Sequence, residues 1–226
     1  ILLKKDRAYA EIINDVNDSV ITFFKILQDE QSSSWLQLLI KNTPYSRALY
    51  EESRIKSVTD MMQAHQFLIR SHMGFNTAAL NTGFRSDSSR KGSIPAHNWV
   101  DLPKIIEATT AKLRGVVIEN QPALKTMKKH DCPDTLHFVD PPYLPETRSA
   151  TSKYVNDMDF QDHADLLDCL HGLQGAVVLC GYDNPMYDSN LVLAWGWKRV
   201  EKTSYTAQKQ KRTECLWLNP WAQLRL

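Results

Sequence analysis

The sequence predicts an α/β fold in which a doubly wound, mostly parallel sheet ends in an antiparallel edge pair and carries a helical insertion. Three observations support this prediction. Short apolar runs alternate with segments of helical period on both sides of residues 31–104. Inside that range the alternation stops. Near the end of the chain, the last two apolar runs are joined by a connection too short for a crossover helix.

The chain begins with a strand expected within residues 8–15, followed by an amphipathic helix over residues 17–29. Helical spacing then continues through the insertion, at Trp35 and Leu38 and again at Met61 and Leu68, before a loop over residues 76–97. This loop is rich in Ser, Thr, Asn and Gly, which is typical of an irregular, exposed segment.

After the insertion, strands and helices alternate again. Helices are expected over residues 99–113, up to about residue 129, over 160–170 and after residue 184. Strands are expected over residues 116–119, 136–139, 176–180, 197–203 and 214–218. We therefore predict one domain made of residues 1–30 and 105–226, with residues 31–104 inserted into it.

Composition narrows the classes of protein to consider. A chain of 226 residues with 42% hydrophobic residues can bury a sizeable core, and the formal net charge of +1 does not by itself point to a polyanionic partner. We expect a cytoplasmic protein, because no membrane span or signal peptide is evident. The four cysteines have no zinc-site spacing, so we expect buried, reduced thiols and no metal.

The segment with the clearest chemistry is the tetrapeptide Asp140, Pro141, Pro142 and Tyr143, directly after a strand that we expect to be buried. Ligands of open α/β sheets bind beyond the carboxyl ends of strands. The Asp140 carboxylate and the Pro141 carbonyl can accept hydrogen bonds from an exocyclic amine, and Tyr143 offers a ring for a planar base to stack on. Two acceptors around one amine direct its lone pair out of the ring plane, toward an electrophile. The alternative is a merely stiff turn.

The chain resembles the Dam-like DNA adenine methyltransferases of phages and prophages. The resemblance rests on AEIINDVNDSVITFFKILQD, DPPYLPETRSATSKY, VVLCGYDNPMYD and KRTECLWLNP, in that order along nearly the whole chain. It implies a Rossmann-like methyltransferase fold and residues 31–104 as the target-recognition region. It also implies that the tetrapeptide grips an adenine rotated out of double-stranded DNA, since an enzyme cannot reach the amine inside the duplex.

The resemblance further implies S-adenosylmethionine as methyl donor, with Asp15 on its ribose hydroxyls and Asn120 and Asp140 beside it. Doubly wound folds commonly bind a ribose with an acid at a strand end. From the residues alone, Asp15 could equally cap the following helix. The family's glycine-rich cofactor loop has no counterpart in this sequence, and we expect it in an N-terminal part of the protein. Where relatives carry an acid near the cofactor adenine, this sequence reads Glu119-Asn120-Gln121-Pro122.

Local charge indicates where DNA could bind. Residues 198–212 contain six Lys or Arg and one Glu. This composition is expected of a phosphate-binding edge, but also of a solvated edge hairpin. Phe75 and Asn76 resemble an aromatic-Asn pair that Dam-like enzymes insert beside the target base, although Phe75 could equally face the core. The DNA contacts that we predict are Arg70, Phe75, Asn76, Arg85, Arg90, Lys91, Arg148, Lys153, Lys209, Lys211 and Arg212.

Two other functions remain open on the sequence alone. The chain could methylate adenine in RNA, or it could be an inactive DNA-binding remnant. An acid at position 140 favours adenine over cytosine or protein amides, whose enzymes usually carry Ser or Asn there. The recognition sequence and the oligomeric state cannot be predicted from this sequence.

Overall fold

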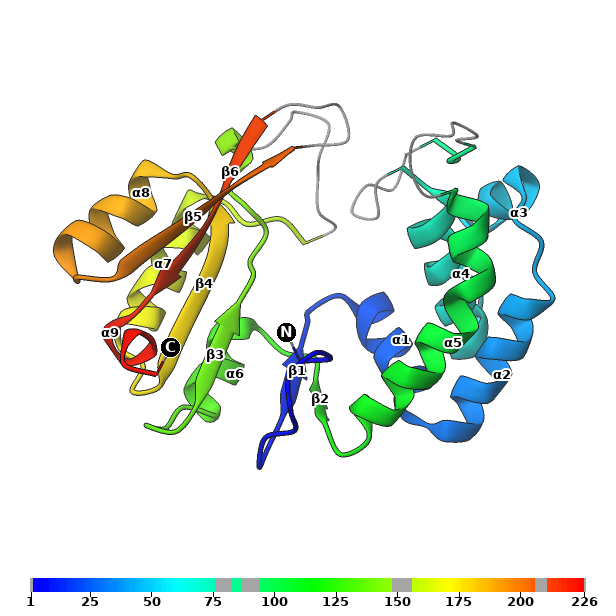
Figure 1. Ribbon diagram of the computed structural model, residues 1–226, viewed down its shortest axis with the longest axis horizontal. Coiled ribbons are helices and arrows are strands. Elements are labelled where there is room, and N and C mark those ends of the chain that lie inside the picture. The colour runs from blue at the N-terminus through cyan, green and yellow to red at the C-terminus, as the bar shows by residue number, and fades with distance from the viewer. Residues whose placement is uncertain (1, 76–82, 87–93, 148–155, 206–210, 226) are drawn as a thin grey trace. The chain divides into compact units, whose positions relative to one another are not determined.

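A computed structural model of the protein describes residues 2–75, 83–86, 94–147, 156–205 and 211–225. The chain forms two compact units, residues 1–121 and residues 122–226. The fold is mixed α/β, as the sequence predicts, with helices and strands distributed over both units (Figure 1).

The first unit has two strands and five helices among its described residues. They are β1 (Ile12–Asn14), α1 (Asp18–Gln28), α2 (Glu30–Lys41), α3 (Arg47–Glu52), α4 (Asp60–Met73), α5 (Pro95–Leu113) and β2 (Val117–Glu119). Strands β1 and β2 pair in parallel, with Ile13 opposite Ile118. The five helices form the long connection between these strands, and such a connection is what a parallel pair requires.

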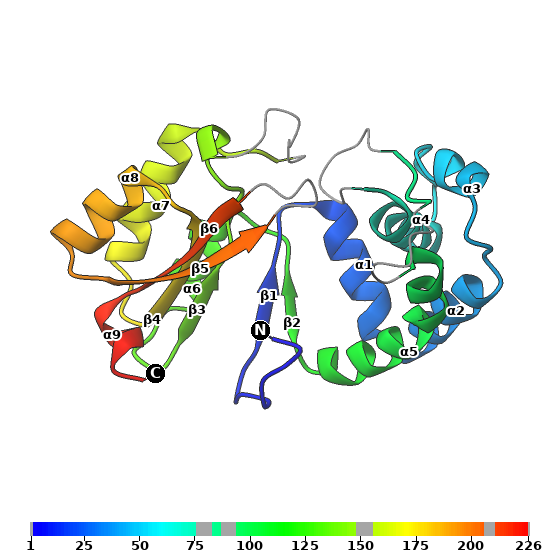
Figure 2. The ribbon, with the colours of Figure 1, turned by 45° about the horizontal axis from the view of Figure 1, so that its top comes forward.

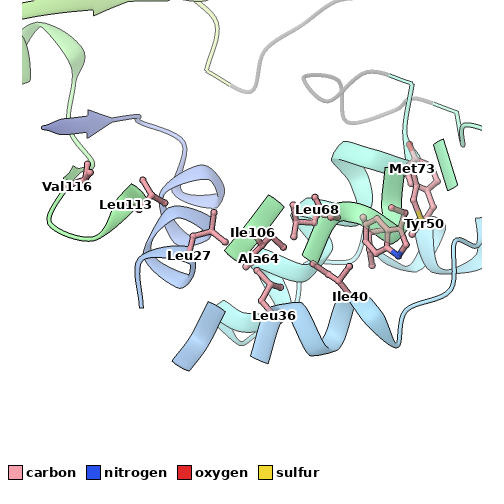
Figure 3. Packing of buried hydrophobic residues seen from close by; sticks show 13 residues of the cluster. Leu27, Leu36, Ile40, Tyr50, Ala64, Leu68, Met73, Ile106, Leu113 and Val116 are labelled. Atoms are coloured by element: carbon pink, nitrogen blue, oxygen red, sulfur yellow. The ribbon is translucent and has the colours of Figure 1, made fainter. Parts of the chain in front are cut away.

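The helices of this unit share one apolar core. Leu27 of α1, Leu36 of α2, Ala64 of α4 and Ile106 of α5 are at most 3% exposed and belong to a single cluster (Figure 3). Helix α1 begins at its N-cap Asn17, whose side chain accepts a hydrogen bond from the Ser19 amide. Apolar burial of this extent stabilises the helices that connect the two short strands.

The second unit contains the longer sheet. Its elements are α6 (Ala123–Lys129), β3 (Leu136–Val139), η1 (Pro145–Thr147), α7 (Phe160–His171), β4 (Ala176–Tyr182), α8 (Pro185–Tyr187), η2 (Asp188–Ala194), β5 (Lys198–Tyr205), β6 (Lys211–Leu218) and α9 (Pro220–Gln223). The strand order is β3-β4-β6-β5. The pair β3 and β4 is parallel, and β6 is antiparallel to both β4 and β5.

The two faces of this sheet differ. Helix α7 lies against one face of the sheet (Figures 1 and 2). Val177 and Leu179 of β4 and Trp217 of β6 are fully buried on that face, in a cluster with side chains of α7 and η2. Side chains alternate along a strand, so Val178, Cys180 and Tyr182 lie on the opposite face. That face therefore carries the side chains at the carboxyl end of β4 that α7 does not cover.

Several details differ from the prediction. Strands β5 and β6 are longer than expected, because much of the basic connection between them belongs to the hairpin itself. The final helix α9 was not predicted. Cys169, Cys180 and Cys215 are buried free thiols as expected, whereas Cys132 is exposed. The described pairings comprise two parallel and two antiparallel ones, so they are mixed rather than mostly parallel.

No helix in the described parts of the chain is long and apolar enough to cross a membrane.

Candidate functional site

The predicted tetrapeptide begins at the residue that follows β3. Val139 is opposite Leu179 in the parallel pair, so Asp140 lies at the level of Cys180. After the tetrapeptide, the chain is fixed by a buried Leu144, whose carbonyl accepts hydrogen bonds from the backbone amide and the hydroxyl of Thr147 at 2.9 and 2.8 Å. The motif is thus held between a strand and a closed turn, which restrains Asp140 and Tyr143.

The electrostatics of the motif are unusual for exposed carboxyl and phenol groups. Asp140 keeps an exposed surface, but the protein around its carboxyl excludes solvent, and this loss of solvent raises the pKa of Asp140. The hydrogen bond from Tyr143 lowers the same pKa, and the charge of Glu214 raises it. Burial and the Asp140 charge raise the pKa of Tyr143. The Cys180 thiol, buried near Asp140 and Glu214, has its pKa raised to about 12. The tyrosine therefore stays a neutral donor to the carboxylate.

Tyr182, at the end of β4, is a part of this site that the sequence analysis missed. Its ring meets the ring of Tyr143 edge to face, with 4.6 Å between centroids and 74° between planes. The guanidinium of Arg212 lies over the Tyr182 ring, 5.9 Å from its centroid. The stretch VVLCGYDNPMYD contained the signal, because strand alternation places Tyr182 on the same face as Cys180.

The predicted cofactor residues of the first unit, Asp15 and Asn120, lie together. The Asn120 side chain donates to the Asp15 carbonyl at 2.9 Å, just beyond the carboxyl ends of β1 and β2. The Asp15 carboxylate accepts a hydrogen bond from the Asn17 amide at 2.8 Å. Because Asn17 is the N-cap of α1, the alternative that Asp15 caps this helix is wrong.

A second pair of hydrogen bonds fixes the same strand ends. The Asn14 side chain donates to the Gln121 carbonyl at 3.0 Å and accepts from the Gln121 amide at 3.1 Å. The Asp15 carboxylate is therefore anchored by one oxygen on a braced strand end. Such a carboxylate is suited to accept hydrogen bonds from the two hydroxyls of a ribose.

Phe75 follows α4, next to an isolated antiparallel bridge between Gly74 and Phe84. Its amide donates to the Gly83 carbonyl at 3.1 Å. Phe84 packs inward, with its ring centroid 5.2 Å from that of Tyr45. Phe75 itself is 63% exposed, so the alternative of a core-facing Phe75 is wrong. Phe75 therefore presents an aromatic ring on a backbone that is held by its bond to Gly83.

Arg70 and Arg85 are two of the predicted DNA contacts. Both form hydrogen bonds with residues of the first unit. The Arg70 guanidinium donates to the Ser53 carbonyl. The Arg85 backbone donates to Met73 at 2.7 Å and accepts from the Tyr45 hydroxyl at 2.8 Å. Their contacts with DNA stay predictions.

The basic edge, residues 198–212, has fewer cationic groups available for DNA than its composition suggests. Arg199 forms ion pairs with Asp183 at 2.7 Å, with Glu201 at 2.8 Å and with Asp188, and its side chain is 18% exposed. Three carboxylates therefore bind the two terminal nitrogens of this guanidinium and compete with any phosphate for them. Lys211 is exposed at the start of β6.

The remaining predicted DNA contacts, Asn76, Arg90, Lys91, Arg148, Lys153 and Lys209, lie outside the described residues. Within the described ranges, no group of three or more His, Cys, Asp or Glu side chains is arranged to hold a metal ion.

Comparison with known proteins yields one family. The D12 class N6 adenine-specific DNA methyltransferases match residues 2–211. No curated protein matches the chain. The matched range includes the tetrapeptide, Tyr182, Asp15 and Asn120.

Proposed function

Because the chain belongs to the D12 class of N6 adenine-specific DNA methyltransferases, we propose that it transfers a methyl group from S-adenosylmethionine to the exocyclic amine of an adenine rotated out of the duplex. The observation that supports this most is the Asp140 carboxylate at the end of β3, partly withdrawn from solvent and hydrogen-bonded by Tyr143. Such a carboxylate is a strong acceptor for an amine.

Each residue of the motif has a role in this proposal. Asp140 and the Pro141 carbonyl accept the two hydrogens of the adenine amine, and the nitrogen lone pair then points out of the base plane. Pro142 stiffens the turn, because its ring fixes the backbone. The ring of Tyr143 stacks on the base. Rate enhancement comes mainly from positioning and from an acceptor that strengthens as the amine nitrogen gains positive charge.

The chain's own residues fit the proposed cofactor. We assign the ribose hydroxyls to Asp15, which Asn120 braces through the 2.9 Å bond to its carbonyl. We keep Asn120 and Asp140 as further cofactor residues on the ground of the sequence prediction. S-adenosylmethionine would supply an electrophilic methyl group and leave as the neutral thioether, and the methylated amine would release one proton to solvent. Everything else in the reaction that we assign to this chain is binding and orientation.

The DNA contacts follow the sequence prediction. Exposed Phe75, held by its backbone bond to Gly83, inserts beside the target base, and cationic side chains hold the phosphates. From the described residues we assign this role to Arg85 and Lys211, and from the sequence to the cationic residues outside the described ranges. We keep the sequence-based assignment of residues 31–104 to target recognition and of residues 1–30 and 105–226 to catalysis.

The test is transfer of labelled methyl groups to double-stranded DNA by the full-length protein. We expect Asp140→Ala to abolish transfer while the thermal unfolding midpoint is kept. Asp168→Ala, which removes an exposed carboxylate on α7, is the matched control and should leave transfer unchanged. Normal transfer by Asp140→Ala refutes the assigned site. Transfer to RNA in place of DNA refutes the assigned substrate, and absent cofactor binding in calorimetry identifies an inactive remnant.

A further inference from the structure

Three side chains outside the tetrapeptide share one face of the sheet beside it. Tyr182 of β4 is opposite Glu214 of β6, and Arg212 is two residues from Glu214 on the same strand. Because side chains alternate, all three lie on the face of Cys180, at the end of β4 next to Asp140. They are therefore neighbours of the catalytic motif rather than of the α7 core.

Tyr182 is held firmly on this face. Its backbone belongs to the antiparallel ladder between β4 and β6, five residue pairs long from Val178 to Tyr182. On the opposite face the preceding residue, Gly181, leaves room for the Trp217 indole, since a Cβ at position 181 would come within 3.1 Å of that ring. The strand end that carries Tyr182 is thus packed from behind and cannot shift freely.

The contact between Tyr182 and Tyr143 restrains the ring plane of Tyr143. Edge-to-face pairs are favoured at centroid separations of 4.5–7 Å, and the 4.6 Å separation lies at the close end of this range. The Tyr143 hydroxyl is bound to Asp140, which fixes one end of the side chain. Rotation about the remaining axis of Tyr143 is limited by Tyr182. A ring that must stack on a base needs both restraints.

We propose that Tyr182 is a positioning residue for Tyr143, and that Arg212 acts in the same assembly by holding the outer face of the Tyr182 ring. The proposal rests on the proposed function, because it gives Tyr143 a base to stack on. It also gives Arg212 a role other than the phosphate contact expected from sequence. The guanidinium 5.9 Å from the ring centroid is within the range of a cation–π interaction.

Kinetics of the full-length enzyme provide the first test. Tyr182→Ala should lower kcat by about three- to tenfold, in line with the strength of aromatic pairs, and leave KM for DNA nearly unchanged. Tyr182→Phe should keep kcat within about twofold, because the ring and not the hydroxyl makes the contact. Phe160→Ala removes an exposed ring on α7 and should change neither constant. Equal losses in the Ala and Phe variants contradict the proposal.

A substitution at Arg212 distinguishes its two possible roles, which are to hold the Tyr182 ring or to contact a DNA phosphate. If it holds Tyr182, Arg212→Ala lowers kcat and leaves the salt dependence of DNA binding as in the wild type. If it contacts a phosphate, the variant binds DNA more weakly and the slope of log K against log salt falls by about one. The second result overturns the role proposed for Arg212.

A spectroscopic readout tests the positioning independently of methyl transfer. With 3-fluorotyrosine at position 143, the ¹⁹F resonance should be displaced from that of the free amino acid by the neighbouring ring. Tyr182→Ala should move it back toward the free value, and Phe160→Ala should not. An unmoved resonance in folded Tyr182→Ala refutes the contact. If the wild type methylates no nucleic acid, the proposed function fails, but the resonance still decides whether Tyr182 orders Tyr143.

Discussion

Replacing Asp140 by Asn separates the charge of this side chain from its shape. The carboxamide has nearly the same size, and its oxygen can still accept the hydrogen bond from Tyr143. Its NH₂ group, however, is a donor, and in the proposed reaction it would face the adenine amine, which is also a donor. The substitution therefore removes the acceptor for the substrate and leaves the packing of the motif in place.

The expected loss follows from the strength of one charge-assisted hydrogen bond. Such bonds contribute about 1.5–3 kcal/mol, and about 1.4 kcal/mol changes a rate tenfold. A roughly 10- to 150-fold slower transfer is the least that we expect, since the misplaced donor adds to the loss. The assay is single-turnover transfer of labelled methyl groups to a short duplex, with Asp168→Asn as the matched control.

The same variant should not be less stable at neutral pH. The pKa of Asp140 is raised in the folded protein, mainly by loss of solvent around the carboxyl. At pH values above that pKa, the ionised carboxyl therefore destabilises the fold, and this cost disappears as the pH falls through the raised pKa toward its ordinary value. Asn carries no charge, so its unfolding midpoint at neutral pH should equal or exceed that of the wild type. A rate within about threefold of wild type, or clear destabilisation, refutes the reasoning.

Three further results are expected. Glu214→Gln removes a charge that raises the pKa of Asp140, so the acidic limb of the pH profile of kcat/KM should move to lower pH. An acidic limb that stays in place or moves to higher pH contradicts this role of Glu214. Leu179→Ala, at a fully buried position of β4, should lower the free energy of unfolding by about 2–5 kcal/mol in denaturant titration, whereas the exposed Leu193→Ala should change it little. Phe75→Ala should weaken binding to target DNA without lowering the unfolding midpoint, because the ring is 63% exposed; the opposite pattern would identify a structural ring.

Local sequence signals predicted the elements that carry the motif. Strand β3 has the predicted bounds, because Asp140 and two prolines follow Val139, and prolines cannot continue a strand ladder. Its burial differs from the prediction, since His137 is the one buried residue of its four. Helix α1 also agrees closely with the prediction, since Asn17 offers a side-chain acceptor to the first free amides of the helix. Both signals act within a few residues, so one sequence contains them.

Contacts between distant residues could not be predicted in this way. Arg199 counts as a basic residue of the edge in composition, but Asp183 and Asp188 reach it from a different part of the chain and neutralise it. Tyr182 meets Tyr143 only because β3 and β4 pair in parallel and bring both ends together. Strand pairing and register decide these contacts, and neither is evident from residue types alone.

The exposure of Phe75 was likewise undecidable from sequence. An aromatic residue at the end of an amphipathic helix suits either the core or a binding surface. The structure assigns the core position to Phe84, which packs against Tyr45 and Tyr50, and leaves Phe75 outside. The bridge from Gly74 to Phe84 makes the difference, because it sets which of the two rings points inward.

The central claim is that the Asp140 site methylates adenine in DNA. Base-resolution mapping of N6-methyladenine, in DNA from cells that express the full-length gene in a background without other adenine methylation, tests it most directly. The account predicts methyladenine at one recurring short sequence with the wild type and none with Asp140→Ala produced at the same level. DNA without methyladenine in both cultures, or equal methylation in both, would contradict it.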